Sequence, residues 1–162
     1  MNYFDLFELP FAPSVNKADL SRKYFELQRK FHPDFFSDAT EQEREDTLDQ
    51  SAAVNKAFNT FKDEQKTIEY FLQEKGLIYT DEKYSLPNEF LMEMMEINEL
   101  LEENDQASNL IKVNGMAEEM YNEVKPVIER YSPDTTDLEL LKIKEYYYKK
   151  KYLNRILDRL VD

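Results

Sequence analysis

The sequence predicts an all-helical protein with two helical units. Only two of its 162 residues are glycine, Gly76 and Gly115, whereas sheets depend on tight turns that glycine favours. Apolar residues recur at steps of three and four along most of the chain, which is the spacing of a helix face. The pattern is interrupted after Gly76, so we expect an N-terminal unit over residues 1–75, a linker over 76–85 and a C-terminal unit over 86–162.

The composition excludes several kinds of chemistry. The chain has no cysteine and a single histidine, His32, which rules out disulfides, thiolate chemistry and a histidine-rich metal site, so we expect no metal and no cofactor. The net charge of -13 disfavours nucleic acid and anionic membranes as partners. The N-terminus lacks the features of a signal peptide, and no run approaches the roughly 18 apolar residues of a membrane span. We therefore expect a soluble cytoplasmic protein.

Two long antiparallel helices are predicted in the first unit. The first covers residues 16–31, with an apolar stripe made of Leu20, Tyr24, Leu27 and Phe31. The second covers 41–61 and begins at an N-cap supplied by Asp38 or Thr40. Its predicted inner face consists of Leu48, Ala52, Asn55 and Phe58.

Short elements are expected to close this hairpin. A first helical turn packs its apolar side chains across it, namely Tyr3, Phe4, Leu6 and Phe7. A shorter helix over 63–75 buries Ile68, Phe71 and Leu72. Gly76 follows this helix directly and is expected to form its C′ cap.

Basic side chains gather on the outer face of the first long helix. At about 100° per residue, Arg22 and Arg29 lie opposite the apolar stripe, with Lys23 and Lys30 beside them. Residues 15–33 hold five basic and two acidic side chains, a local net charge of +3 in a chain of -13. A solvated helix face and a docking surface both explain this strip. We favour docking because the strip leads into an unusual corner.

That corner is the tripeptide His32-Pro33-Asp34. Its proline stops the preceding helix and biases His32 towards an extended backbone, which presents the three side chains at an exposed turn. An enzyme that uses His32 and Asp34 as acid and base is one reading. It is disfavoured because the chain has no second histidine, no cysteine and no glycine-rich loop. Contact with a partner protein is the other reading.

The second unit is predicted to be an antiparallel three-helix bundle. Its helices cover residues 87–103, 106–131 and 134–160, and the short loops between them favour antiparallel neighbours. Ser132-Pro133 is expected to supply the N-cap and the first position of the last helix. Pro126 lies inside the middle helix and is expected to kink or shorten it.

One face of the helix over 87–103 carries more apolar residues than a solvated face needs. Its predicted core face consists of Phe90, Met94, Ile97 and Leu101. Glutamates and further apolar residues lie elsewhere on the helix: Met92, Glu96, Glu99 and Glu103 opposite the core, Leu91 and Met95 on its flank. Residues 86–105 contain seven acidic and no basic side chains. These apolar residues either contact another part of the bundle or form a protein-binding patch.

These segments together resemble a known family. SRKYFELQRKFHPDFF, preceded by NYFDLFELP and followed by QSAAVNKAFNTFKDEQKTIEYFL, resembles a J domain. With NEFLMEMMEINELLEE and the C-terminal KYLNRIL, nearly the whole chain is similar to an HscB-type J-domain co-chaperone of iron–sulfur cluster assembly. One departure is Phe35, which stands where J domains commonly carry a basic residue, so some docking charge is lost or Phe35 packs on the partner.

The resemblance implies two binding surfaces and no enzymatic activity of its own. It implies that the chain stimulates the ATPase of a heat-shock-70-type (HscA-like) chaperone through His32, Pro33 and Asp34, with docking charges on Arg22, Lys23, Arg29 and Lys30. It implies binding of an IscU-like iron–sulfur scaffold protein through Leu91, Met92, Met95, Glu96, Glu99, Glu103 and Tyr152. Tyr152 projects near a predicted core stripe with Leu138, Tyr148 and Ile156. A J-domain protein with another client, or a helical interaction protein without a chaperone, remains the alternative.

Overall fold

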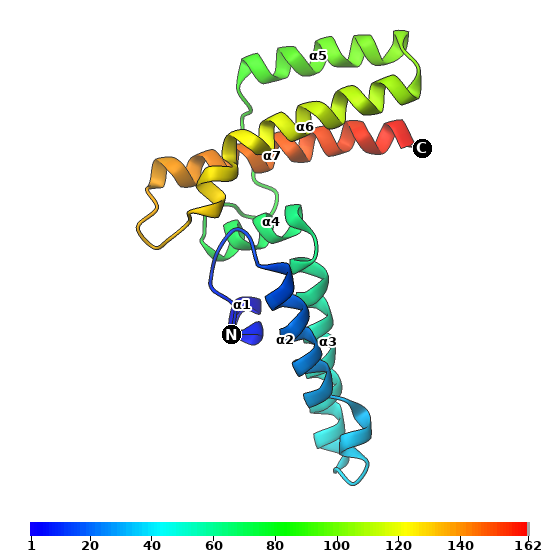
Figure 1. Ribbon diagram of the computed structural model, residues 1–162, viewed down its shortest axis with the longest axis vertical. Coiled ribbons are helices and arrows are strands. Elements are labelled where there is room, and N and C mark those ends of the chain that lie inside the picture. The colour runs from blue at the N-terminus through cyan, green and yellow to red at the C-terminus, as the bar shows by residue number, and fades with distance from the viewer. Residues whose placement is uncertain (162) are drawn as a thin grey trace. The chain divides into compact units, whose positions relative to one another are not determined.

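The computed structural model describes residues 1–161, apart from the side chain of Pro33, and every regular element in this range is a helix (Figure 1). The predicted all-α class is confirmed. The chain divides into two compact units, Met1–Gly76 and Leu77–Asp162. None of the described helices is long and apolar enough to cross a membrane.

The first unit is a hairpin of two long helices, α2 (Lys17–Lys30) and α3 (Glu41–Phe61), which lie side by side in Figure 1. Short helices close it: α1 (Tyr3–Phe7), the 3-10 helix η1 (Pro33–Phe36) and α4 (Glu64–Glu74).

Side-chain caps explain where these helices begin and end. Thr40, one of the two predicted caps, accepts a hydrogen bond from the backbone of Glu43 and starts α3 with a full capping box. Asn16 caps α2 with a single bond, which its side chain accepts from the backbone N–H of Asp19. Gly76 follows α4 with a φ of +77°, a conformation that residues with a side chain adopt only with strain, so the predicted C′ cap is confirmed.

The core of the first unit is mostly aromatic. Phe4, Phe7, Phe61 and Phe71 are fully buried, and the ring centroids of Phe4 and Phe61 lie 4.9 Å apart. Lys17 extends its ammonium to the carbonyl oxygen of Phe61 at 3.0 Å. This bond satisfies a carbonyl at the end of α3 that has no partner within the helix, and it ties the start of α2 to that end.

The predicted inner face of α3 is partly wrong. Leu48 and Ala52 are exposed, whereas the buried residues of this helix are Thr47, Val54, Ala57 and Phe61. Thr47, Val54 and Phe61 are seven residues apart, or nearly two turns, so they share one face. Sequence patterning missed Thr47 because it is polar, yet its hydroxyl donates to the carbonyl of Glu43 at 2.8 Å and is therefore satisfied when buried.

Asn55 and Phe58 do face α2 as predicted. The ring of Phe58 stacks on Tyr24 at 3.9 Å. The side-chain oxygen of Asn55 accepts hydrogen bonds from the hydroxyl of Tyr24 and the amide of Gln28, both at 2.9 Å. The two long helices are thus joined by polar bonds as well as by apolar packing.

The second unit contains α5 (Asn88–Glu103), α6 (Gln106–Glu129) and α7 (Asp137–Val161), each reversing the direction of the one before (Figure 1). The predicted antiparallel three-helix bundle is confirmed. Its main core cluster draws on all three helices and consists of Phe90, Met94, Ile97, Val113, Ala117, Leu153 and Ile156. The predicted core face of α5 is also confirmed, since Leu101 packs against this cluster.

The start of α7 differs from the prediction. Ser132 accepts from the backbone N–H of Asp134 in a tight turn and does not cap the helix. Thr136 takes that role, because its hydroxyl accepts from the backbone N–H of Glu139 at 3.2 Å. Leu138, expected in the core stripe, is exposed.

The first turn of α7 buries Leu140 instead, which lies in register with the buried Ile143 and Tyr147 further along the helix. The middle helix α6 ends at Glu129, two residues before the predicted end and shortly after Pro126.

Residues 77–85, assigned to a linker from sequence, belong to the second unit and are held there by Glu82. Its carboxylate receives hydrogen bonds from the ammonium of Lys144 and the hydroxyl of Tyr148, each at 2.7 Å. The side chains of Glu82 and Lys144 are only 11% and 15% exposed. Tyr84 stacks on Tyr148 at 4.5 Å. We call Glu82, Lys144, Tyr148 and Tyr84 the clasp.

The clasp shifts the ionisation of its own members. The hydrogen bond from Lys144 lowers the pKa of Glu82, burial opposes this shift, and the bond from Tyr148 adds to it. Burial, followed by the bond to Glu82, raises the pKa of Tyr148 above its usual range. The carboxyl group of Glu82 is therefore ionised at neutral pH, and Tyr148 is a neutral donor to it.

The two neighbouring methionines of α5 should differ in their effect on stability. Met94 is 0% exposed and Met95 is 64% exposed. Met94→Ala should lower the free energy of unfolding by about 3 kcal/mol through the cavity it leaves. Met95→Ala should change it by less than about 0.5 kcal/mol. Denaturant unfolding followed by circular dichroism measures both, and equal losses would contradict the assigned faces.

Glu82→Gln should destabilise the protein in a pH-dependent way. The lowered pKa means that the unfolded chain binds more protons than the folded chain between the two pKa values. The stabilisation is complete above the unfolded pKa and is lost as the pH falls through the folded one. At pH 7 we expect a loss of about 2 kcal/mol, because an ammonium is left unpaired. Denaturant unfolding between pH 7 and pH 3 should show the free energies of unfolding of the wild type and Glu82→Gln converging as the pH falls. A difference between them that stays constant over this range would contradict the prediction.

Candidate functional site

The His32-Pro33-Asp34 corner is held by hydrogen bonds of its own. Helix α2 ends at its C-cap Phe31, and His32 adopts an extended backbone with φ −68° and ψ 132°, as predicted. The Nδ1 atom of His32 accepts from the backbone N–H of Asp34 at 3.3 Å, so the imidazole caps η1. The side chain of Pro33 lies outside the described residues.

This bond determines which atoms of the corner face a partner. Nδ1 of His32 is the acceptor of this bond and also lies 3.5 Å from Oδ2 of Asp34, so Nε2 is the ring nitrogen left to donate to a partner. The side chains of His32 and Asp34 are 52% and 87% exposed. The corner therefore offers one N–H donor and one carboxylate acceptor to a partner from a fixed turn.

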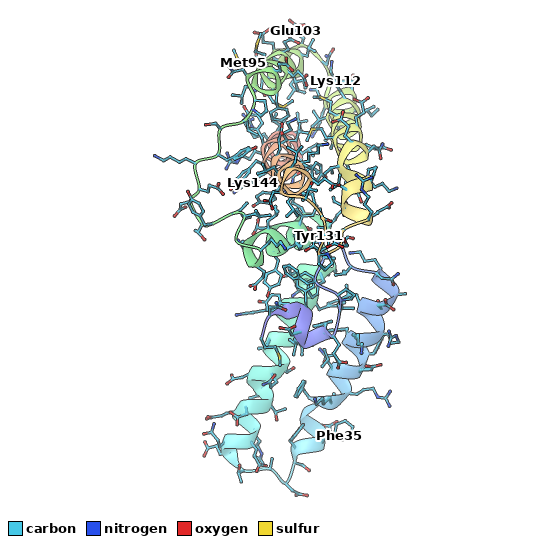
Figure 2. All side chains as sticks on the ribbon, turned by 90° about the vertical axis from the view of Figure 1, so that its left-hand side faces the viewer. Phe35, Met95, Glu103, Lys112, Tyr131 and Lys144 are labelled. Carbon is cyan, nitrogen blue, oxygen red and sulfur yellow. The ribbon has the colours of Figure 1, made fainter. Side chains whose placement is uncertain are left out.

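The loop after the corner is anchored to α3. The guanidinium of Arg44 donates to the carbonyl oxygen of Ser37 at 2.8 Å, and the backbone N–H of Ala39 bonds to Phe36. Phe35 is exposed, and its ring meets that of His32 edge-on at 6.2 Å. Figure 2 shows Phe35 near the end of the hairpin. An apolar ring thus stands next to the donor and the acceptor.

The four basic residues of α2 that were predicted as docking charges fall into two pairs. Arg22 forms ion pairs with Asp19 and Glu26, at 3.3 and 3.6 Å. Lys23 contacts Glu8 and Glu26, at 3.5 and 3.8 Å, and its side chain is only 18% exposed.

Arg29 and Lys30 are exposed and form no ion pair with any described carboxylate, although the ammonium of Lys30 lies 5.4 Å from the ring centroid of Phe31. These are also the two that directly precede the corner. The pairs of Arg22 could be read from helical spacing, but Glu8 is 15 residues from Lys23 and only the fold brings them together.

The second predicted surface lies on α5. Leu91, Met92 and Met95 are exposed, as are Glu96, Glu99 and Glu103. None of these three carboxylates has an ion-pair partner among the described residues. Figure 2 shows Met95 on the side of α5 away from Lys112 of α6. The apolar residues therefore face water and do not fill the bundle.

Tyr152 belongs partly to the core and partly to the surface. It is half-buried against the core cluster, and its ring meets that of Phe90 edge-on at 6.0 Å. This agrees with its predicted position near the core stripe of α7. Because Phe90 lies at the start of α5, Tyr152 links the exposed side of α7 to that helix.

Comparison with known proteins identifies relatives over the whole chain. The family described as "HSCB C-terminal oligomerisation domain" matches residues 86–161. The co-chaperone protein HscB homolog of Shewanella halifaxensis is 32% identical over 165 residues, covering 99% of this chain and 95% of that protein. Those of Photobacterium profundum and Shewanella amazonensis are 41% and 44% identical over 110 residues. These two matches span only 64% and 63% of the length of those relatives.

Two solved structures have the same fold. The crystal structure of human co-chaperone protein HscB has a TM-score of 0.81 and 28% identity, covering 99% of this chain and 80% of that chain. The chaperone HscB from Vibrio cholerae has a TM-score of 0.62 and 30% identity, with 99% of both chains covered.

Proposed function

This chain belongs to the HscB family of co-chaperones, and we propose that it stimulates the ATPase of an HscA-like chaperone of the heat-shock-70 type. It delivers an IscU-like iron–sulfur scaffold protein to that chaperone and so assists the maturation of iron–sulfur proteins. The cytoplasm is the compartment we propose for it. The observation that carries the proposal is the exposed corner of His32 and Asp34 directly after two unpaired cations, Arg29 and Lys30.

The corner acts on the chaperone by binding, with no chemistry of its own. The unpaired cations of α2 steer the encounter with an acidic surface, and this attraction falls with ionic strength. The Nε2–H of His32 and the carboxylate of Asp34 then make specific hydrogen bonds. If these bonds form better with the ATP-hydrolysing conformation, they shift the population of the chaperone towards it.

The scaffold protein binds to the exposed face of α5. Met92, Met95 and Leu91 supply apolar contact area, and methionine side chains adapt to an irregular partner surface. Glu96, Glu99 and Glu103 require basic groups on the partner. The partner is therefore a surface with apolar residues beside arginine or lysine.

The two proposed activities should be separable by mutation, because their residues lie in different units. His32→Gln removes the imidazole of the corner and should abolish stimulation of ATP hydrolysis in single-turnover assays, with scaffold binding unchanged. Met92→Ala combined with Glu99→Ala should weaken scaffold binding about tenfold or more and leave basal stimulation unchanged. Isothermal titration calorimetry measures the binding.

Several outcomes would contradict this proposal. Stimulation that survives His32→Gln would exclude the corner as the contact. A wild-type protein that captures neither the chaperone nor the scaffold protein in co-purification would favour a helical interaction protein of another kind. Capture of the chaperone alone would favour a different client.

The two pairs of basic residues should contribute unequally to chaperone docking. Arg29→Gln with Lys30→Gln removes the unpaired charges and should raise the concentration for half-maximal stimulation about threefold to tenfold. Arg22→Gln with Lys23→Gln is the matched control, since it removes the same charge from residues already paired within the chain. It should have the smaller effect. Equal effects would mean that net charge alone, and not pairing, determines docking.

A further inference from the structure

A cluster of basic residues lies near the end of α7, in a chain of strongly negative charge. Residues 149–159 contain five basic side chains and one acidic one, Asp158. Three of the five are engaged by neighbours: Lys149 by Glu145, Lys150 by Asn154 and Lys151 by the ring of Tyr147. The other two, Arg155 and Arg159, are exposed and form no ion pair within the part of the chain that the structure describes.

Tyr152 lines two hollows of this surface. One, of about 500 Å³, is lined by Tyr152, Arg155, Asp158 and Arg159. The other, of about 230 Å³, shares Tyr152 and Arg155 and is completed by residues that include Lys83, Tyr84 and Leu86. Both hollows therefore combine an aromatic ring with a guanidinium.

The clasp keeps this surface positive. Glu82 also lines the smaller hollow, but Lys144 and Tyr148 both donate to its carboxylate. It is therefore not available to neutralise Lys83 or Arg155, and neither has an ion pair among the described residues. We call Tyr152, Arg155 and Arg159 of α7, together with Lys83 from the segment before α5, the α7 ledge.

We propose that the α7 ledge is a second half of the scaffold-binding face and receives a carboxylate-bearing segment of the scaffold protein, with an apolar side chain against Tyr152. The inference rests on the proposed function and adds the chemistry of the partner. It is supported by position, because Leu86, two residues before α5, lines the same hollow as Tyr152 and Arg155, so the ledge reaches the start of that helix. It is also supported by charge, because unpaired guanidiniums bind carboxylates with two parallel hydrogen bonds.

A binding face that is negative on α5 and positive on the α7 ledge determines how the scaffold protein is oriented. The glutamates of α5 attract basic groups, and the α7 ledge attracts acidic ones. A partner turned by half a revolution meets like charges on both helices, and such contacts are unfavourable. An acidic helix alone would not distinguish between these orientations.

Charge reversal on the ledge tests the inference. Arg155→Glu should weaken binding of the IscU-like scaffold protein to the full chain about fivefold or more in isothermal titration calorimetry. Lys112→Glu is the matched control, because it makes a like charge reversal at an exposed residue of α6 that lines neither hollow. It should weaken binding less than about twofold. Circular dichroism and thermal unfolding check that both variants fold, and Arg159→Glu serves as a second ledge variant.

The direction in which Arg155→Glu changes the affinity for the scaffold protein shows whether the ledge contacts an acidic segment. Tighter binding by Arg155→Glu would mean that the partner is basic at this position too, and an effect equal to that of Lys112→Glu would mean no contact. Either result overturns the inference. If Met92→Ala with Glu99→Ala still weakens binding, the proposed function stands without the ledge. If the wild-type chain does not bind the scaffold protein at all, both fall. Restoration of binding by reversing one carboxylate of the scaffold protein would support the ledge.

Discussion

The burial of one apolar stripe on each long helix is the constraint on which both surfaces depend. In α5 the fully covered Met94 fixes the rotation of the helix, and that rotation leaves Met92 and Glu99 in water. In α2 and α3 the stacking of Tyr24 on Phe58 does the same for the basic strip. A helix has a single rotation, so the residues that build the core also decide which residues are left for partners. Substitutions on the outer faces can therefore change binding with little effect on the fold.

Ion pairing within the chain then selects among the exposed charges. A basic residue that already contacts a carboxylate must give up that contact before it serves a partner, and its net gain is correspondingly small. Lys23 is such a residue, whereas Arg29 and Lys30 are not. On α7 the same selection separates Lys149 from Arg155. The unpaired charges therefore indicate the candidate docking residues more narrowly than the charged residues of the sequence do.

Much of the fold could be predicted from the sequence because its signals are local. The limits of α3, its cap Thr40 and the left-handed Gly76 follow from residues within one or two turns of each other. Contacts between distant residues could not be predicted. Glu82 meets Lys144 across 62 residues, so from the sequence alone the segment that holds Glu82 was assigned to a linker. Thr47 was missed because it is polar, although its hydroxyl is satisfied by its own helix. Leu138 was misplaced because it shares a helix face with Ile156, whereas near the start of α7 the buried face is that of Leu140. The residues of both candidate surfaces were named from the sequence and their binding roles stay predictions, but which of their charges are paired required the structure.

The exposed methionines of α5 also make this face sensitive to oxidation. Thioethers are converted by oxidants to polar sulfoxides, and the chain has no cysteine to react in their place. Met92 and Met95 are open to solvent, whereas Met94 between them is fully covered. An oxidant therefore reaches the exposed sulfur atoms first and makes an apolar surface polar, while the core remains intact. The exposed face of α5 is in this sense redox-labile, and a sulfoxide reductase would restore it.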